Sequence, residues 1–380
     1  MKELPEKLIQ KLQARSTQNA LRTLPVQKTL TDFSSNDYLG FATSETIFRE
    51  THQLLTENNI RQNGATGSRL LSGNHKLYET AETMLCTFHK SEAALIFNSG
   101  YSANSSFFSC IPQRGALILY DEYIHASIRD GITMSNAKAY KFKHNDLEHL
   151  NAVLNRTGHN GVTYIVTESV FSMDGDSPDL HQLVAVARKY NAFLIVDEAH
   201  AVGVFGKNGS GLIQHLNLEN EIFARIITFG KAAGCHGAAV LGSNILKTYL
   251  VNFARSLIYT TALSPHAVAT ILTAYQHLKT EKTAVKKLKD NINFFNLKIK
   301  AAKLDQMFIK SHSAIHSCVI PGNEKVKHIA HQLHTNGFDV KPILSPTVPK
   351  GEERLRFCLH SYNTTTDMET VINLLSTFVV

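Results

Sequence analysis

The segment AFLIVDEAH (192–200) runs from five apolar residues into Asp197, Glu198 and His200. Apolar runs of similar length recur, with helical patterns between them, at AALIFN (93–98), ALILYDE (116–122), VTYIVTES (162–169), ARIITFG (224–230) and AAVLGS (238–243). Apolar strands that alternate with helices are typical of a mostly parallel sheet covered by helices. The sequence therefore predicts an α/β fold.

Polar residues stand where several of these predicted strands end, namely Asn98, Glu168, Asp197 and Thr228. Ligands of open α/β sheets bind beyond the carboxyl ends of the strands. We therefore expect a binding site at that edge of the sheet.

Three segments are predicted along the chain. Residues 1–45 combine an N-terminal helical pattern with a loop that is expected to bind substrate, and residues 46–280 form the large α/β domain. Strand and helix patterns in residues 281–380 indicate a smaller α+β domain.

Composition narrows the functional classes. Lys and Arg outnumber Asp and Glu by 39 to 32 in the 380 residues, but they are scattered, which favours anionic substrates over nucleic acid. No stretch approaches the roughly 20 apolar residues of a membrane span. Five cysteines without a C-x-x-C pair predict a reduced, cytoplasmic protein.

The VDEAH segment (196–200) has three interpretations. A nucleotide-hydrolysing DEAH motif also needs a G-x-x-x-x-G-K-[ST] loop, and the sequence contains none. Asp197 is otherwise a buried structural carboxylate, or an acid that keeps a heterocyclic nitrogen protonated. A pyridinium with a neighbouring phenolic oxygen, within reach of His200, describes pyridoxal phosphate, whose aldehyde needs a lysine.

The stretch ITFGKAAGCHGAAVLGS (227–243) supplies one lysine, Lys231, among small residues. A lysine in such a loop is often a solvated surface charge. Small residues also let the backbone approach a bulky ligand, and a partly desolvated amine forms a Schiff base with a carbonyl.

Three further patterns bear on function. NSGYSANSSFF (98–108) reads as a strand, a turn and a helix N-terminus, a typical phosphate site. His125 follows a predicted strand and is either a core histidine or a ring that stacks on a cofactor. His328, His331 and His334 recur at helical spacing without a matching acid or cysteine, so we predict a solvated helix face and no metal centre.

Taken together and in order, these and further motifs resemble the α-oxoamine synthases. The resemblance rests on FSSNDYLG (33–40), GATGSRLLSGNH (64–75), FNSGYSAN (97–104), HASIRDG (125–131), TESVFSMDGDSPDL (167–180), VDEAHAVGVFGKNGSG (196–211), TFGKAAGCHGAAVLGS (228–243), LIYTTALSP (257–265) and SPTVPKGEERLRF (345–357). It implies a homodimer with an aspartate-aminotransferase-like large domain and pyridoxal phosphate as cofactor.

The resemblance also implies roles for individual residues. Lys231 would bind the cofactor covalently, Asp197 would hold the pyridine nitrogen, and His125 would stack on the ring. The other positions that it implies for cofactor contact are Ser99, Gly100, Tyr101, Ser172, His200, Thr228 and, from the partner subunit, Thr260 or Thr261. The positions that it implies for substrate contact are Arg22, Asn36, His125, Thr347 and Arg356, with Arg356 gripping a carboxylate.

Within the family, FSMDGDSP (171–178) and DEAHAVGVFG (197–206) are more similar to the alanine-using members of biotin biosynthesis. This similarity implies L-alanine and a pimeloyl thioester as substrates, on coenzyme A or an acyl carrier protein. Glycine-using members and serine palmitoyltransferases are the nearest alternatives. An aminotransferase and a non-catalytic relative remain as more distant ones.

Overall fold

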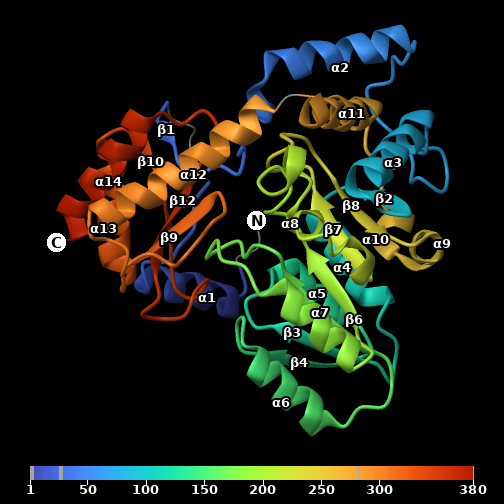
Figure 1. Cartoon of the computed structure of the whole chain (residues 1–380), viewed down its shortest axis with the longest axis horizontal. Coiled ribbons are helices and arrows are strands. Elements are labelled where there is room, and N and C mark those ends of the chain that lie inside the picture. The colour runs from blue at the N-terminus through green and yellow to red at the C-terminus, as the bar shows by residue number, and fades with distance from the viewer. Residues whose placement is uncertain (1–3, 25–28, 281, 380) are drawn as a thin grey trace. The chain divides into compact units, whose positions relative to one another are not determined.

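The computed structural model describes residues 4–24, 29–280 and 282–379 and divides into two compact units (Figure 1). Unit 1 comprises the described parts of Met1–Ser35, Met173–Gly175 and Lys289–Val380, and unit 2 comprises Asn36–Ser172 and Asp176–Leu288. The division at residues 45 and 280 stays a prediction, because the units are defined by contacts and not by role.

Unit 2 is built on a seven-stranded sheet with the order β2-β8-β7-β6-β5-β3-β4. The strands are β2 (Ala93–Phe97), β3 (Leu117–Asp121), β4 (Lys138–Phe142), β5 (Thr163–Glu168), β6 (Phe193–Asp197), β7 (Ala224–Thr228) and β8 (Ala238–Gly242). Only β8 is antiparallel to its neighbours, so the other six strands have their carboxyl ends at one edge. The predicted mostly parallel sheet is confirmed.

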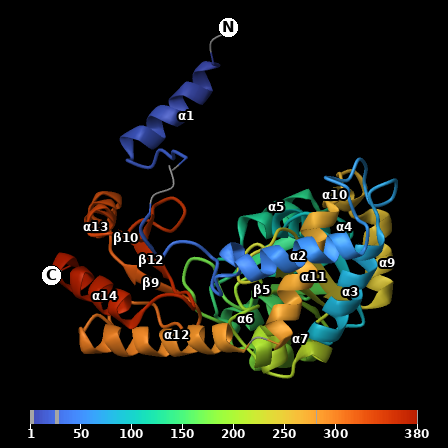
Figure 2. The same cartoon turned by 90° about the horizontal axis from the view of Figure 1, so that it is seen from above.

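Helices cover both faces of this sheet. One apolar cluster joins it to α4 (Gly100–Cys110), α5 (Ala126–Met134), α9 (Asn244–Phe253) and α10 (Arg255–Ile258). The cluster on the other face involves α6 (Leu147–Thr157), α7 (Leu180–Lys189) and α8 (Leu212–His215). Further out, α2 (Glu45–Glu57) lies along α11 (Pro265–Thr280), which also contacts α3 (Lys76–His89) (Figures 1 and 2).

Unit 1 combines a small sheet with helices, as expected for an α+β domain. Its strands β9 (Ile315–Val319), β11 (Lys341–Ile343) and β12 (Arg354–Cys358) form an antiparallel sheet in the order β11-β12-β9. A separate parallel pair joins β1 (Thr31–Asp32) to β10 (Phe338–Asp339). The helices of unit 1 are α1 (Glu6–Thr17), α13 (Asn323–Thr335), α14 (Thr365–Val379) and most of α12 (Thr283–Ala301).

The loop 229–237 joins β7 to the reversed strand β8 and contains Lys231. Backbone groups of the loop form hydrogen bonds with one another: Phe229 N donates to Gly237 O (2.9 Å), and Gly234 N donates to Lys231 O (2.8 Å). At Gly234, where φ is +62°, a Cβ would lie 2.2 Å from Ala42 N, so a side chain has no space there. Gly234 therefore allows close packing of this loop against the backbone of Phe41 and Ala42.

In the part of the chain that the structure describes, no helix has both the length and the apolar character that spanning a membrane requires.

Candidate active site

A cavity of about 250 Å³ lies at the carboxyl edge of the sheet of unit 2, where the polar residues were expected. Five strands lead into it: β2, β3, β5, β6 and β7. It is lined by Ser99, Gly100, Tyr101, Asn104, His125, Ser127, Glu168, Asp197, Ala199, His200, Thr228, Gly230, Lys231, His236 and Gly237. The structure therefore brings together Lys231, Asp197, His125 and His200, which were predicted from separate motifs.

Asp197 is the last residue of β6 and is 5% exposed. Its Oδ2 accepts a hydrogen bond from Asn104 Nδ2 (2.8 Å), and its Oδ1 accepts one from the amide of Ala199 (2.8 Å). These donors fix the plane of the carboxylate at the cavity wall. A buried carboxylate held in this way is suited to face a cationic group on a ligand.

A hydrogen-bonded chain connects Asp197 to His125. Asn104 Nδ2 also donates to Ser127 Oγ (3.1 Å), and Ser127 Oγ lies 2.8 Å from His125 Nδ1. The Ser127 amide donates to the same Nδ1 (3.2 Å), so Nδ1 is an acceptor and the ring proton of the neutral form lies on Nε2. Burial lowers the pKa of His125, and the charge of Lys231 lowers it against the opposing effect of Asp197. The imidazole is therefore neutral at pH 7.

His200 lies 5% exposed at the other side of the cavity. Its Nδ1 is 2.7 Å from the hydroxyl of Tyr38, which also donates to Asn36 Oδ1 (3.1 Å). Asn36, predicted to bind substrate, is thus linked to a residue of the cavity wall through Tyr38.

The start of α4 forms the end of the cavity predicted to bind phosphate. Ser99 caps the helix, its Oγ accepting from Ser102 N (3.1 Å), so one of the amides expected to be free is already paired. The hydroxyl of Thr228 is buried and has no hydrogen-bond partner among the described residues. A Cβ on Gly100 would lie 2.6 Å from Thr228 Cγ2, so only glycine allows the start of α4 to lie this close to Thr228.

Other predicted cofactor residues lie differently. Tyr101 lines the cavity, but its side chain is half exposed and its hydroxyl donates to Asp130. Ser172 is buried and is not among the residues that line the cavity, and neither are Thr260 and Thr261. Thr261 O accepts from Asn98 Nδ2 (2.7 Å). The expected contact of these threonines with a partner subunit stays a prediction.

The remaining predicted substrate residues belong to unit 1. Arg22 Nη2 donates to Thr347 Oγ1 (3.2 Å), so two residues 325 positions apart meet there. Arg356 lies on β12 and is 6% exposed, with one guanidinium nitrogen 2.9 Å from Cys358 Sγ.

The comparisons with known proteins agree with this geometry. The family model for aminotransferases of class I and II matches residues 28–375. The 8-amino-7-oxononanoate synthase of Emericella nidulans is 39% identical over 91% of this chain and 89% of its own length. That of Lysinibacillus sphaericus is 35% identical, over 96% and 93% respectively.

Two solved structures are similar as well. A serine palmitoyltransferase from S. paucimobilis, with bound pyridoxal phosphate and myriocin, has a TM-score of 0.88 at 27% identity, covering 98% of this chain and 96% of its own. An 8-amino-7-oxononanoate synthase from Francisella tularensis has a TM-score of 0.79 at 30% identity, covering 92% and 98%.

The chain belongs to the aminotransferase class I and II family. Within it, these relatives place the chain among the α-oxoamine synthases, so the predicted family, the fold class and pyridoxal phosphate as cofactor are confirmed.

The residues of the cavity fit that cofactor. The buried hydroxyl of Thr228, which has no partner in the described part of the chain, and the N-terminus of α4 suit a phosphate group. At the other end, Asp197 presents a carboxylate, and Lys231 supplies an amine from the β7–β8 loop. Donors for an anion, an acid for a ring nitrogen and an amine for an aldehyde are therefore all in one cavity.

Sequence reasoning did not find every residue of the site. Asn104 lies within one of the motifs, and the sequence suggests no role for it, although it follows Gly100 by four residues and therefore shares its helix face. Glu168 ends a predicted strand, and that position alone suggests no specific function. Ser127 and His236 also line the cavity without having been predicted.

His144 contacts Asp121, the last residue of β3, four residues before His125. Its Nδ1 and Nε2 lie 2.9 Å from Asp121 and Asp176 respectively, and Tyr123 stacks on the ring at 4.5 Å. Burial lowers the pKa of His144, but hydrogen bonds to both carboxylates and their charges outweigh burial and raise it to about 10. A protonated His144 thus anchors the segment after β3 that carries His125.

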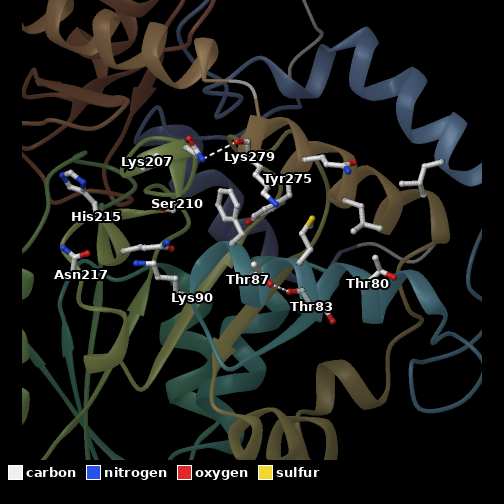
Figure 3. Close-up of a pocket in the computed structure, with 17 residues that line it drawn as sticks. Thr80, Thr83, Thr87, Lys90, Lys207, Ser210, His215, Asn217, Tyr275 and Lys279 are labelled. Atoms are coloured by element: carbon white, nitrogen blue, oxygen red, sulfur yellow. Dashed lines mark hydrogen bonds between the residues drawn. The ribbon is translucent and has the colours of Figure 1, made fainter.

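A second cavity of unit 2 is larger, about 900 Å³, and lies between α3, α11 and the segment 207–217 (Figure 3). Thr83 and Thr87 of α3 and Tyr275 and Lys279 of α11 contribute to its wall. Among the described residues that line it, none is a predicted cofactor residue. Size alone would favour this cavity, whereas the chemistry of the side chains favours the smaller one.

Proposed function

We propose that this protein condenses L-alanine with a pimeloyl thioester to give 8-amino-7-oxononanoate, carbon dioxide and free thiol. The proposal rests on the 35–39% identity of this chain to two 8-amino-7-oxononanoate synthases, over at least 91% of its length. In the reaction, Cα of alanine bonds to the acyl carbonyl carbon, the thiol leaves, and the carboxylate of alanine departs as carbon dioxide.

Pyridoxal phosphate, when bound, withdraws electrons from Cα of the amino acid. Lys231 would hold the cofactor through its amine and, once released by the amino acid, would take the proton from Cα. Asp197 would keep the ring nitrogen protonated, since an opposed charge in a buried site favours the charged form. Thr228 and Ser99 would bind the phosphate, and His200 would approach the phenolic oxygen. Ser172, which is not among the residues that line the cavity, is proposed as a second neighbour of that oxygen on the resemblance alone.

His125 would place its neutral ring against the cofactor ring and the substrate. Two donors from Ser127 already hold its Nδ1, so the ring orientation exists before substrate binds. A preformed orientation reduces the entropy that must be lost on the way to the transition state.

The far carboxylate of a pimeloyl group needs a cation or hydroxyl, because an unpaired buried carboxylate is costly. Arg22 and Thr347 are our candidates, and their mutual hydrogen bond supports treating them as one site. The proposal covers a pimeloyl group carried on coenzyme A or on an acyl carrier protein.

We further propose that the active enzyme is a cytoplasmic homodimer in which Thr260 or Thr261 of one subunit reaches the cofactor phosphate of the other. Five free cysteines suit a reducing compartment. Sedimentation velocity of the wild-type protein and of a Thr260→Ala/Thr261→Ala double variant measures assembly, and titration of each with pyridoxal phosphate measures cofactor affinity. The double variant should remain a dimer and bind the cofactor more weakly.

Arg356→Lys should raise the dissociation constant for L-alanine by about tenfold or more, because an ammonium cannot replace the planar fork that pairs with a carboxylate. The measurement is the spectral change of the bound cofactor on titration with alanine. Arg49→Lys, on exposed α2, is the matched control and should bind alanine normally. An unchanged affinity in Arg356→Lys would exclude this residue from the amino-acid site.

The deciding experiment for the proposed function is a matrix of alanine, glycine, serine and threonine against pimeloyl, succinyl, acetyl and palmitoyl thioesters, followed by thiol release. Alanine with the pimeloyl donor should give the highest kcat/KM. If glycine with succinyl or acetyl, or serine with palmitoyl, exceeds it by more than about tenfold, about 1.4 kcal/mol in transition-state free energy, the substrate assignment is wrong. Incubation with alanine alone should release no pyruvate, whereas an aminotransferase would release it.

A further inference from the structure

Glu168 is a buried acid in the cavity to which the proposed reaction gives no task. It is the last residue of β5, is 2% exposed, and lies beside Asp197 of β6 in the sheet register. The side chain lines the cavity together with Asp197 and Lys231. A second carboxyl group next to the proposed partner of the ring nitrogen needs a physical explanation.

The hydrogen bonding of Glu168 points to His125. The backbone amide of His125 donates to Glu168 Oε1 at 2.5 Å, across 43 residues of sequence. His125 is the N-cap of α5, and its ring is held from the other side by Ser127. Glu168 thus holds the main chain of His125 while Ser127 holds its side chain.

We propose that Glu168 is a positioning residue of the active site. Its carboxyl group fixes His125 through a hydrogen bond and does not act there as a negative charge. The proposal rests on the assignment of the cavity to the cofactor, but not on the identity of the two substrates.

The surrounding charges support a neutral Glu168. Burial raises the pKa of this carboxyl well above its ordinary value, and the negative charges of Asp197 and Asp121 raise it further. Lys231 and the His125 amide lower the pKa but do not outweigh burial. A neutral acid still accepts the amide of His125, and it adds no second negative charge beside Asp197.

Two substitutions separate the hydrogen bond from the charge. Glu168→Gln keeps a carbonyl acceptor at nearly the same place and has no charge, so its kcat should stay within about threefold of wild type. Glu168→Ala removes the acceptor and releases His125, so kcat should fall about 10- to 100-fold, as small displacements at a reacting centre do.

A readout without turnover accompanies these rates. The visible circular dichroism of the bound cofactor reports how the protein orients the cofactor ring. The absorption of the bound cofactor is measured as a function of pH in the absence of substrates. Glu168→Gln should reproduce both wild-type curves, whereas Glu168→Ala should lose a large part of the dichroic band. Glu168→Asp retains acidity but retracts the acceptor by one methylene, so it should resemble Glu168→Ala; it also serves where the alanine variant fails to fold.

Glu198→Gln is the matched control, because Glu198 is equally buried, one residue past Asp197, and pairs with Arg225 (3.7 Å) outside the cavity lining. It should lower the unfolding temperature and leave the cofactor dichroism unchanged.

Two results would overturn the inference. The first concerns Glu168→Gln: its cofactor titration midpoint moves by more than about one pH unit, and its kcat falls as far as that of Glu168→Ala. This result would show that the enzyme needs the negative charge of Glu168. The second is a Glu168→Ala or Glu168→Asp variant with wild-type dichroism and kcat. A wild-type protein that takes up no cofactor would instead refute the proposed function itself.

Discussion

Lys231→Ala is expected to abolish covalent attachment of pyridoxal phosphate and to lower kcat by about 10³-fold or more. The lysine would be both the attachment point and the group that moves the Cα proton, and general base catalysis alone contributes about 10²–10⁴-fold. Borohydride treatment of the wild-type protein followed by peptide mapping should place the label in the 229–237 loop, on Lys231. The alanine variant should carry no label.

The control for this prediction is Lys207→Ala, an exposed lysine of unit 2 that lines the larger cavity. This variant should be labelled on Lys231 and should turn over normally. A label on a different lysine in the wild-type protein would refute the central assignment of the site, whatever the activity of the variant.

Those strands of the large sheet that are buried on both faces could be predicted from the sequence. β2, β5 and β6 read as continuous apolar runs because helices cover the sheet on either side. Strand β4 (Lys138–Phe142) was not predicted. It lies at the edge of the sheet, and its sequence KAYKF is mostly exposed, so its apolar content is low.

The position of the site was predictable for a topological reason. Parallel strands place their carboxyl ends at one edge, so residues that follow different strands converge there without any local signal of contact. Asp197, Thr228 and His125 follow strands in this way and line the cavity, whereas the loop of Lys231 alone left a solvated surface lysine open. The pairing of specific atoms was not predictable, because spacing along the chain carries no information about it.

Long-range hydrogen bonds illustrate that limit. Asn104 reaches Asp197 across 93 residues, and Tyr38 reaches His200 across 162. No periodicity relates such partners, since each pair is brought together by sheet order and loop path. The same holds for the contact between Glu168 and the amide of His125, whose role emerged only from geometry.

Asp197→Asn is expected to preserve the fold and to lower kcat by about 10³-fold, with the cofactor still attached to Lys231. An amide oxygen can still accept from Ala199 N, and Asn104 can reverse its side-chain amide to accept from the new Nδ2, since its own Oδ1 now has no partner among the described residues. The reversal gives up the hydrogen bond that Asn104 Nδ2 donates to Ser127 Oγ, so we expect a structural cost of about 1 kcal/mol.

The chemical cost of Asp197→Asn is large because a neutral amide does not hold a ring nitrogen protonated, and withdrawal of electrons from Cα then weakens by several kcal/mol, each 1.36 kcal/mol being about tenfold in rate. The measurements are kcat with alanine and a thioester, the solvent exchange of the alanine Cα proton, and the unfolding temperature. Exchange should slow in proportion to kcat while the unfolding temperature stays near that of wild type. Near-normal exchange of the Cα proton would show that Asp197 is a structural carboxylate. A large fall in the unfolding temperature would likewise indicate that the main role of Asp197 is structural.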